Sequence, residues 1–202
     1  MDTLAPLKIK IIIGSTRPGR FSEKPAHWIK DVAAMRDGLQ VDLLDLRDYP
    51  LPFFDEAPQA LRTGEYVNPV ATRWAQQVRE GDGYIIVSPE YNHGYPAVLK
   101  NALDYVYTAW NSKPVGFVSY GGVAGARGVQ QLRQVAIELQ MAPIRNAIHL
   151  PLDVYLAAMK EPTPVNPEVF KPSRAAADAF LDQLVWWAKA LKAARLAEMT
   201  QP

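Results

Sequence analysis

Polar side chains gather in two loops that each follow an apolar segment of the chain. The first loop, residues 14–20, holds two arginines and two hydroxyl side chains. A helix predicted to begin near residue 22 would add unpaired N–H groups and a partial positive charge, and arginine binds phosphate through paired hydrogen bonds. The pattern favours a phosphate site, although a helix cap with two solvated arginines has the same composition. The candidate phosphate ligands are Ser15, Thr16, Arg17, Arg20 and Ser22.

The second loop, residues 89–96, has the composition of a site for a planar ring. A proline at each end stiffens the loop, and Gly94 is open to backbone conformations that other residues avoid. Two tyrosines supply flat apolar faces, and Asn92 can bind the edge of a heteroaromatic ring. The alternatives are tyrosines that only pack, a surface salt bridge for Glu90, and a solvated His93, which we do not predict to act as a base. The candidate ring contacts are Pro89, Glu90, Tyr91, Asn92 and Gly94.

A third loop, residues 119–128, carries four glycines within eight residues. Glycines let the backbone approach a ligand and donate N–H groups to it, although a flexible turn before a helix would look the same. The further candidate contacts are Ser119, Tyr120, Gly121 and Gly122. Together the three loops predict a ligand with a phosphate at one end and a planar ring at the other.

The elements that must position these loops alternate between strand and helix. Strands are predicted over residues 8–13, 40–46, 84–88, 114–119 and 144–150, and helices over 22–35, 69–80, 97–107, 125–139 and 173 to about 198. This alternation predicts an α/β fold in three layers, with a parallel five-stranded sheet covered by helices on both faces. Right-handed crossovers favour the flavodoxin-like order 2-1-3-4-5, which brings the ends of strands one, three and four together. Residues 1–202 are expected to form one domain with a C-terminal helical extension, about 173–198.

Composition limits the possible functions. The chain has 202 residues, is 49% hydrophobic and carries a net charge of +1, so neither nucleic acid nor an anionic membrane is an expected partner. It has no cysteine, which excludes disulfides, thiolate metal sites and a cysteine nucleophile, and no metal site is predicted. The first apolar run is too short for a signal peptide and no run approaches the length of a membrane span, so a cytoplasmic location is expected.

The loops resemble those of the NADPH-dependent FMN reductases, a family with the flavodoxin-like fold that includes quinone, azo-dye and chromate reductases. The matching stretches are residues 14–17 with Arg20, then 88–92 with Gly94, Pro96, Leu99, Lys100, Asn101 and Asp104, then 120–122. The resemblance runs from about residue 9 to residue 150. Many relatives have Ser-x-Asn after the arginine, whereas this chain has Phe21-Ser22-Glu23, so Arg20 is the candidate to replace the asparagine contact.

The resemblance implies FMN as cofactor and NADPH as co-substrate. The first loop would hold the FMN phosphate and the other two loops would line the isoalloxazine ring. A hydride would pass from NADPH to flavin N5, and an acceptor such as a quinone would then stack in the same place. This ping-pong scheme needs no catalytic side chain, because the cofactor carries the chemistry. The backbone N–H groups of Gly121 and Gly122 suit a developing anion near flavin N1 and O2.

Other functions remain open from the sequence. A flavodoxin-type electron carrier is typically strongly acidic, so the near-neutral charge favours an enzyme, and a hydrolase would need a Gly-x-Ser-x-Gly motif that is absent. An FMN-binding regulatory protein without turnover is a further alternative. Quinone, azo dye, nitroarene and chromate all remain possible acceptors, and the preference for NADPH over NADH rests on the resemblance.

A long loop, residues 47–68, indicates a homo-oligomer. Phe53 and Phe54 would be costly if both were exposed, and in the family the flavin sits beside a dimer interface. We therefore expect at least a dimer, with Phe53 or Phe54 near the flavin of the partner, while the choice between dimer and tetramer stays open. Arg127 is a candidate contact for the extra phosphate of NADPH, with a plain surface charge as the alternative.

Overall fold

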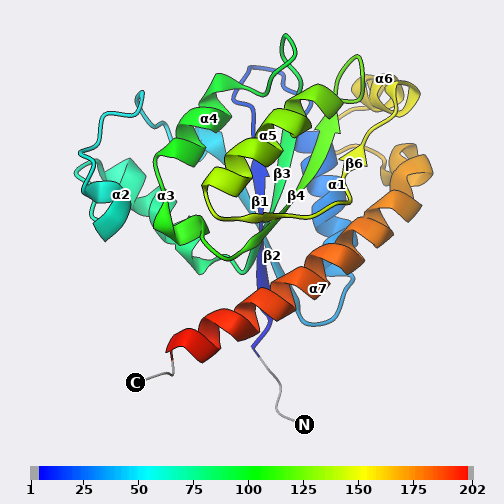
Figure 1. Cartoon of the computed structure of the whole chain (residues 1–202). Helices are drawn as coiled ribbons and strands as arrows, with labels where there is room; N and C mark the ends of the chain where they lie inside the picture. Colours follow the sequence, from blue (N-terminus) through cyan, green and yellow to red (C-terminus); the bar gives the residue numbers. More distant parts are fainter. Residues whose placement is uncertain (1–4, 200–202) are drawn as a thin grey trace.

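In the computed structural model, which describes residues 5–199, a parallel sheet lies between two layers of helices (Figure 1). The sheet order is β2-β1-β3-β4-β5, with β6 also paired to β4. The predicted order and the three-layer architecture are therefore confirmed. The strands are β1 (Leu7–Ile13), β2 (Leu39–Asp45), β3 (Gly83–Pro89), β4 (Pro114–Tyr120), β5 (Ala142–Pro143) and β6 (Ile148–His149).

The prediction of one continuous fifth strand over 144–150 is wrong. The chain instead pairs with β4 in two short pieces, β5 and β6. Between β5 and β6 the backbone finds partners outside the sheet. The guanidinium of Arg133 donates to the carbonyls of Ile144, at 2.6 Å, and Arg145, at 2.9 Å. The N–H of Asn146 donates to the side chain of Gln183 on the last helix. These bonds satisfy backbone groups that an unbroken strand would have paired with β4.

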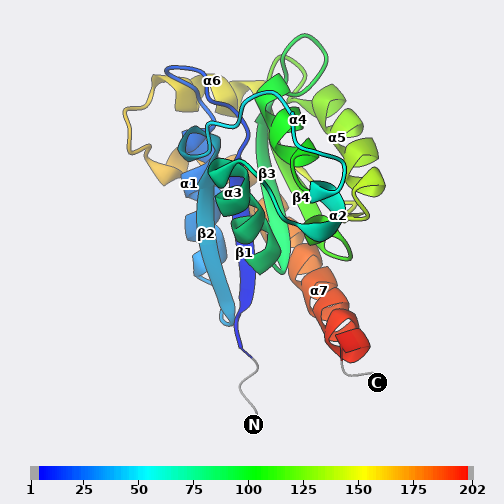
Figure 2. The ribbon, with the colours of Figure 1, turned by 90° about the vertical axis from the view of Figure 1, so that its left-hand side faces the viewer.

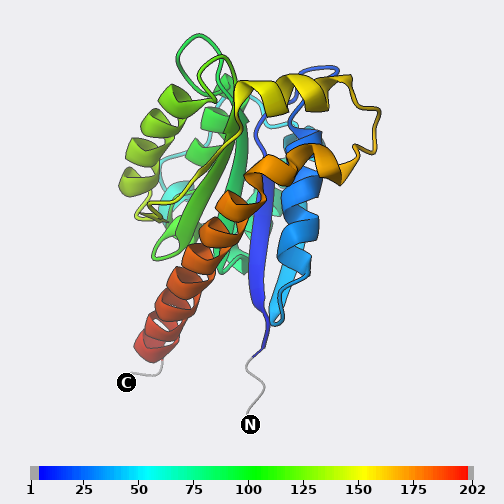
Figure 3. The same ribbon diagram turned by 90° about the vertical axis from the view of Figure 1, so that its right-hand side faces the viewer.

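Helices cover both faces of the sheet. Figure 2 shows α3, α4 and α5 on one side, and Figure 3 shows α1 and α7 on the other, with α6 at the carboxyl end of the sheet. Within residues 5–199, no helix is long and apolar enough to cross a membrane. The α-helices are α1 (Glu23–Ala34), α2 (Ala60–Thr63), α3 (Pro69–Glu80), α4 (Ala97–Asp104), α5 (Ala126–Glu138), α6 (Leu152–Lys160) and α7 (Arg174–Met199), and the 3-10 helices are η1 (Leu46–Asp48), η2 (Thr108–Trp110) and η3 (Pro167–Ser173).

Two of these helices differ from the sequence prediction. The helix predicted to reach residue 107 ends at Asp104, and η2 follows it after a short break. No helix is predicted from the sequence between the fifth strand and the final helix, but the structure has α6 there. That helix starts directly after Pro151, a residue that is favourable just before or at the first turn of a helix.

The final helix packs on the sheet through a stripe of apolar side chains. Ala177, Phe180, Leu181, Leu184 and Ala188 are all buried. The approach to β4 is so close that a Cβ on Gly116 would lie 2.3 Å from the ring of Phe180, so only glycine fits at that position. Beyond the buried stripe, Trp186 remains exposed.

Candidate functional site

The three predicted loops meet at one edge of the sheet, at the carboxyl ends of β1, β3 and β4, which lie at the top of Figure 1. Hydrogen bonds join the loops directly. The N–H of Gly14 donates to the carbonyl of Val87 at 2.9 Å, and the N–H of Glu90 donates to the carbonyl of Tyr120 at 3.1 Å. A Cβ on Gly14 would lie 2.9 Å from the same Val87 oxygen, so the first loop can leave the sheet this closely only with glycine. Ligands in open α/β sheets bind at this edge.

Arg20 is a structural anchor of the first loop. Its guanidinium is only 1% exposed, and its N–H groups donate to the backbone oxygen of Ser15 and to the carboxylates of Asp45 and Glu23. Four hydrogen bonds and a further ion-pair contact with Glu23 thus engage all three nitrogens of the guanidinium. Burial by itself would raise the pKa of Asp45, but hydrogen bonds and charge from Arg20 and Arg47 hold it below the ordinary value. The geometry does not support the prediction that Arg20 contacts a phosphate directly.

Ser22 is also turned into the protein. Its side chain is fully buried, and its hydroxyl lies 2.6 Å from the hydroxyl of Tyr120 at the end of β4. Burial raises the pKa of that tyrosine well above its ordinary value, so the phenol stays protonated. Ser22 and Tyr120 therefore link the first and third loops from below, and direct contact of Ser22 with a phosphate is not supported.

Arg17 carries the exposed guanidinium of the first loop. Among residues 5–199, no hydrogen bond or ion pair engages this side chain, which leaves its donors open to a ligand. Thr16 is half-buried beside it. The loop is held from outside by Arg47, which donates to the carbonyls of Thr16, at 3.3 Å, and Arg17, at 2.7 Å, and to the carboxylate of Glu23. Arg47 is not singled out by the sequence. It follows the end of β2, in a segment that carries no recognisable ligand-binding motif.

The second loop is a tight turn from Tyr91 to Gly94, whose backbone N–H and carbonyl groups bond to each other at 2.8 and 3.0 Å. The left-handed conformations fall on Asn92, with φ of 48°, and His93, with φ of 77°. The expectation that Gly94 takes the special conformation was wrong, and Gly94 instead lies close to the side chain of Gln131. Two adjacent left-handed residues other than glycine are a strained arrangement, typical of ligand sites.

Glu90 forms an ion pair that joins the second loop to α5. Its side chain is only 3% exposed, and it accepts hydrogen bonds from the side-chain Nε, at 2.6 Å, and the backbone N–H, at 3.1 Å, of Arg127. Burial alone would raise the pKa of Glu90, but the hydrogen bonds and charge of Arg127 hold it below its ordinary value. The pair is therefore more than a surface salt bridge, and it fixes the side chain of Arg127.

The third loop folds around Ser119. The hydroxyl of Ser119 is buried, donates to the carbonyl of Ala124 at 2.8 Å and lies 2.8 Å from Nδ1 of His149. A Cβ on Gly125, where φ is +75°, would lie 2.7 Å from the Cβ of Ser119, so the turn requires glycine there. His149 was not singled out from the sequence, since it lies in the broken fifth strand. Burial lowers the pKa of His149, which favours the neutral imidazole beside the loop.

Gly121 and Gly122 face outward from this framework. Gly121 has φ of +149°, and a Cβ on Gly122 would meet no atom within 4 Å. No hydrogen bond within the described part of the chain engages the N–H of either glycine. These free donors stand opposite the second loop, where the ring of Tyr91 is 38% exposed. The site thus offers open donors and a flat face at one end, and an exposed guanidinium at the N-terminus of α1 at the other.

These residues fit FMN in the chemistry of their donors. The Arg17 guanidinium and the N-terminus of α1 suit a phosphate, while the free N–H groups of Gly121 and Gly122 suit the polar edge of a heteroaromatic ring. Ser15 is buried beneath Tyr91, and Ser119 shapes the third loop from behind. The structure thus brings the candidate residues of all three loops to the carboxyl edge of the sheet. Some of them are exposed there, and others are buried and hold the exposed ones in place.

Comparison with known proteins supports this fit to FMN. The family model of the NADPH-dependent FMN reductases matches residues 7–154. A NAD(P)H-dependent FMN reductase of Schizosaccharomyces pombe is 35% identical over 158 residues, which cover 77% of this chain and 79% of that protein. A 2-hydroxy-1,4-benzoquinone reductase of a Burkholderia species is 35% identical over 123 residues, 59% of this chain and 58% of that protein.

A solved structure confirms the fold. The flavoenzyme NAD(P)H:(acceptor) oxidoreductase FerB of Paracoccus denitrificans superposes with a TM-score of 0.66 at 19% identity, and the match covers 88% of this chain and 97% of that one. Members of the matching family use FMN with NAD(P)H as the electron donor. From the match over residues 7–154 and the identity to the yeast enzyme, this chain belongs to the NADPH-dependent FMN reductase family.

Proposed function

We propose that this enzyme transfers a hydride from NADPH to bound FMN and passes the electrons on to a quinone-like or other small oxidant, by a ping-pong scheme. The observation that carries the proposal is the convergence of three loops at the ends of β1, β3 and β4, with free donors on Arg17, Gly121 and Gly122. The quinone reductase among the relatives supports a quinone as acceptor.

The residues divide into those that would touch the cofactor and those that support them. Arg17, Thr16 and the N-terminus of α1 would hold the phosphate, and Ser15 would join them once Tyr91 releases its hydroxyl. Arg20 and Ser22 would keep the loop in place from beneath. On the ring side, the contacts would come from Pro89, Glu90, Tyr91, Asn92, Gly94, Ser119, Tyr120, Gly121 and Gly122, the buried ones through their backbone.

When bound, FMN accepts a hydride from the nicotinamide and gives the electrons to an oxidant. The N–H groups of Gly121 and Gly122 would stabilise negative charge at the polar edge of the ring, because they are fixed in place before the reaction. Tyr91 would provide a flat wall, and the same open face would receive the nicotinamide and then the acceptor in turn. No protein acid or base is required.

A flavodoxin-type electron carrier is the alternative within this fold. The net charge of +1 favours the enzyme, because a carrier that docks on basic partners is typically acidic. A regulatory FMN-binding protein without turnover is the second alternative. Azo dyes, nitroarenes and chromate are candidate acceptors beside quinones.

One experiment separates these functions. The purified protein would be mixed with FMN, desalted, and examined by visible absorption before and after NADPH is added without oxygen. We expect retained flavin bands that bleach with NADPH and return when a quinone is added. Retained bands that do not bleach would favour a carrier or a regulator, and a protein that retains no flavin would refute the assignment of the three loops.

Gly122 offers a matched pair of variants for the same assay. Because a Cβ at this position meets no atom within 4 Å, neither Gly122→Ala nor Gly122→Leu should destabilise the protein. We expect flavin retention to fall with the size of the side chain, since the larger residue would occupy the space of the ring. Flavin retention as high in both variants as in the unmodified protein would place the ring elsewhere.

A further inference from the structure

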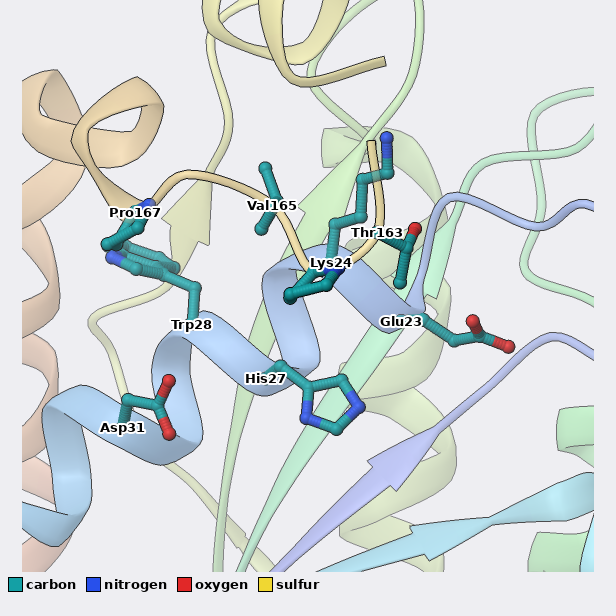
Figure 4. A pocket seen from close by; sticks show the side chains of 9 residues that line it. Glu23, Lys24, His27, Trp28, Asp31, Thr163, Val165 and Pro167 are labelled. Atoms are coloured by element: carbon teal, nitrogen blue, oxygen red, sulfur yellow. The ribbon is translucent and has the colours of Figure 1, made fainter. Parts of the chain in front are cut away.

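A cavity lies on the outer side of α1, between that helix and residues 163–167 of the connection that leads to η3. It has a volume of about 280 Å³. Figure 4 shows the side chains of α1 on one side of it and those of the connection on the other, with Trp28 beside Pro167. None of the three loop segments proposed to touch FMN lines this cavity.

The walls of the cavity are rigid and apolar. Trp28 is only 5% exposed and stacks on Phe170, with the ring centroids 4.9 Å apart and the planes inclined by 27°. Opposite α1, the wall is formed by Pro164, Val165 and Pro167. Prolines and a stacked indole have little freedom to collapse into the space, so the cavity suits the hydrocarbon part of a ligand.

Two of the charged side chains at the cavity already have hydrogen-bond partners. Lys24 donates to the carbonyls of Ala158, at 2.8 Å, and Glu161 at the C-terminal end of α6, where the helix dipole favours a cation. Glu23 accepts hydrogen bonds from Arg20 and Arg47. Lys24 keeps its positive charge, but backbone carbonyls occupy its donors, and Glu23 is paired with two arginines, so neither side chain is free to pair with a ligand.

Asp31 is different. It lies two helical turns after Glu23 on the same face of α1, and within residues 5–199 no hydrogen bond or ion pair engages its carboxylate. His27 lies between the two acids, and its side chain also has no hydrogen-bond partner in the described range. Asp31 is thus the exposed charged side chain of the cavity that is free, among the described residues, to pair with a ligand, and its carboxylate favours a positively charged one.

We propose that this cavity binds a small arylalkyl primary amine. The ammonium group would pair with Asp31, and the aromatic body would lie against Trp28, Val165 and the two prolines. The volume of about 280 Å³ is just below the usual range for ligand pockets, roughly 300 to 1,000 Å³, and so suits a single ring with a short chain. The proposal is independent of the function assigned to the FMN site.

The test uses the full-length protein, labelled with ¹⁵N and kept in excess FMN, and follows the indole N–H resonance of Trp28 by NMR. Trp28→Phe assigns that resonance. The probes are 2-phenylethylamine, the neutral 2-phenylethanol and the anionic 3-phenylpropionate. We expect 2-phenylethylamine to shift the resonance in a saturable way, and the other two probes to bind more weakly.

Asp31→Asn should raise the dissociation constant of the amine about fivefold, the scale expected for one partly exposed ion pair. The control is Asp37→Asn, an exposed aspartate past the end of α1, which should leave binding unchanged. The proposal is overturned if the amine gives no saturable shift up to about 10 mM. It is equally overturned if the acid binds as tightly as the amine, or if Asp31→Asn binds the amine as well as the unmodified protein does.

Discussion

The hydroxyl oxygens of Ser15 and Tyr91 lie 2.9 Å apart, so a hydrogen bond joins the loop after β1 to the loop after β3. Ser15 is buried by this contact, while the ring of Tyr91 keeps an exposed face. A ligand that spans both loops must therefore bind on top of this bond or take the place of one of its partners.

Two substitutions remove the same hydrogen bond with different consequences. Tyr91→Phe and Ser15→Ala should each lower the free energy of unfolding by about 1 kcal/mol. Only Ser15→Ala also removes a donor for a phosphate, so it should raise the dissociation constant of FMN about tenfold, while Tyr91→Phe leaves it nearly unchanged. Urea unfolding and flavin fluorescence quenching measure the two effects. Equal FMN affinities in the two variants would mean that Ser15 does not touch the phosphate.

The Arg20–Asp45 pair predicts a specific dependence of stability on pH. The folded-state pKa of Asp45 is held below its ordinary value, so the pair stabilises fully above the unfolded pKa of 3.8 and loses this contribution as the pH falls through the folded pKa. At pH 7 we expect Asp45→Asn to lower the free energy of unfolding by about 2 kcal/mol, and the gap to the unmodified protein should close below about pH 4.

Urea unfolding at pH 7, 5 and 3 provides the measurement. The control is Asp178→Asn, because the pairs that Asp178 makes with Arg174 and Arg36 are largely exposed. That control should cost less than about 1 kcal/mol at every pH. A gap for Asp45→Asn that stays constant down to pH 3 would contradict the role assigned to the Arg20–Asp45 pair.

We predict that Arg127 stabilises the second loop and does not contact NADPH. Its guanidinium is bound to the buried carboxylate of Glu90, so Arg127→Gln should lower the free energy of unfolding by about 2 kcal/mol. The KM values for NADPH and NADH should then change by the same factor, because the substitution alters the second loop and not a contact to the extra phosphate of NADPH. Steady-state kinetics with both nucleotides checks this outcome.

Arg17→Gln is the matched control, since that side chain is exposed. It should leave stability unchanged and weaken FMN binding. A loss confined to NADPH in Arg127→Gln would instead identify Arg127 as a ligand of the extra phosphate.

The sequence predicts the parts of this fold that depend on local pattern. β3 is found within one residue at each end, because its continuous apolar run is bounded by Gly83 and Pro89. The helix predicted over 69–80 begins and ends where expected, with Asn68 as its N-terminal cap and Pro69 in its first turn. The strand order follows from the alternation of elements and the handedness of their connections.

The parts that depend on distant partners could not be predicted. The fifth strand breaks because Arg133 and Gln183 take up its backbone groups. Arg20 is held inside the protein by Asp45, which is 25 residues further along the chain. The three loops were therefore located correctly, but which of their side chains are exposed depends on tertiary contacts.

Phe53 is the candidate for contact with a second copy of the chain. It is 87% exposed, yet its loop is held firmly to α4, since the N–H of Phe54 donates to Asn101 at 3.0 Å and Asn101 donates to the carbonyl of Pro52 at 2.7 Å. We expect light scattering after size exclusion to show a dimer or tetramer. Phe53→Ser should weaken association at least about tenfold, because burial of a phenylalanine contributes roughly 1.5–3 kcal/mol.

Trp186→Ser tests whether α7 forms the interface instead. Trp186 is also a large exposed side chain, but it lies on the helix that covers the opposite face of the sheet from α4. If association runs through the loop at Phe53, Trp186→Ser keeps the oligomer of the unmodified protein. Dissociation by Trp186→Ser alone would move the interface to α7, and a monomeric unmodified protein would refute association altogether. In either of those cases, Phe53 could not lie beside the flavin of a partner, and the site would have to work with residues of one chain.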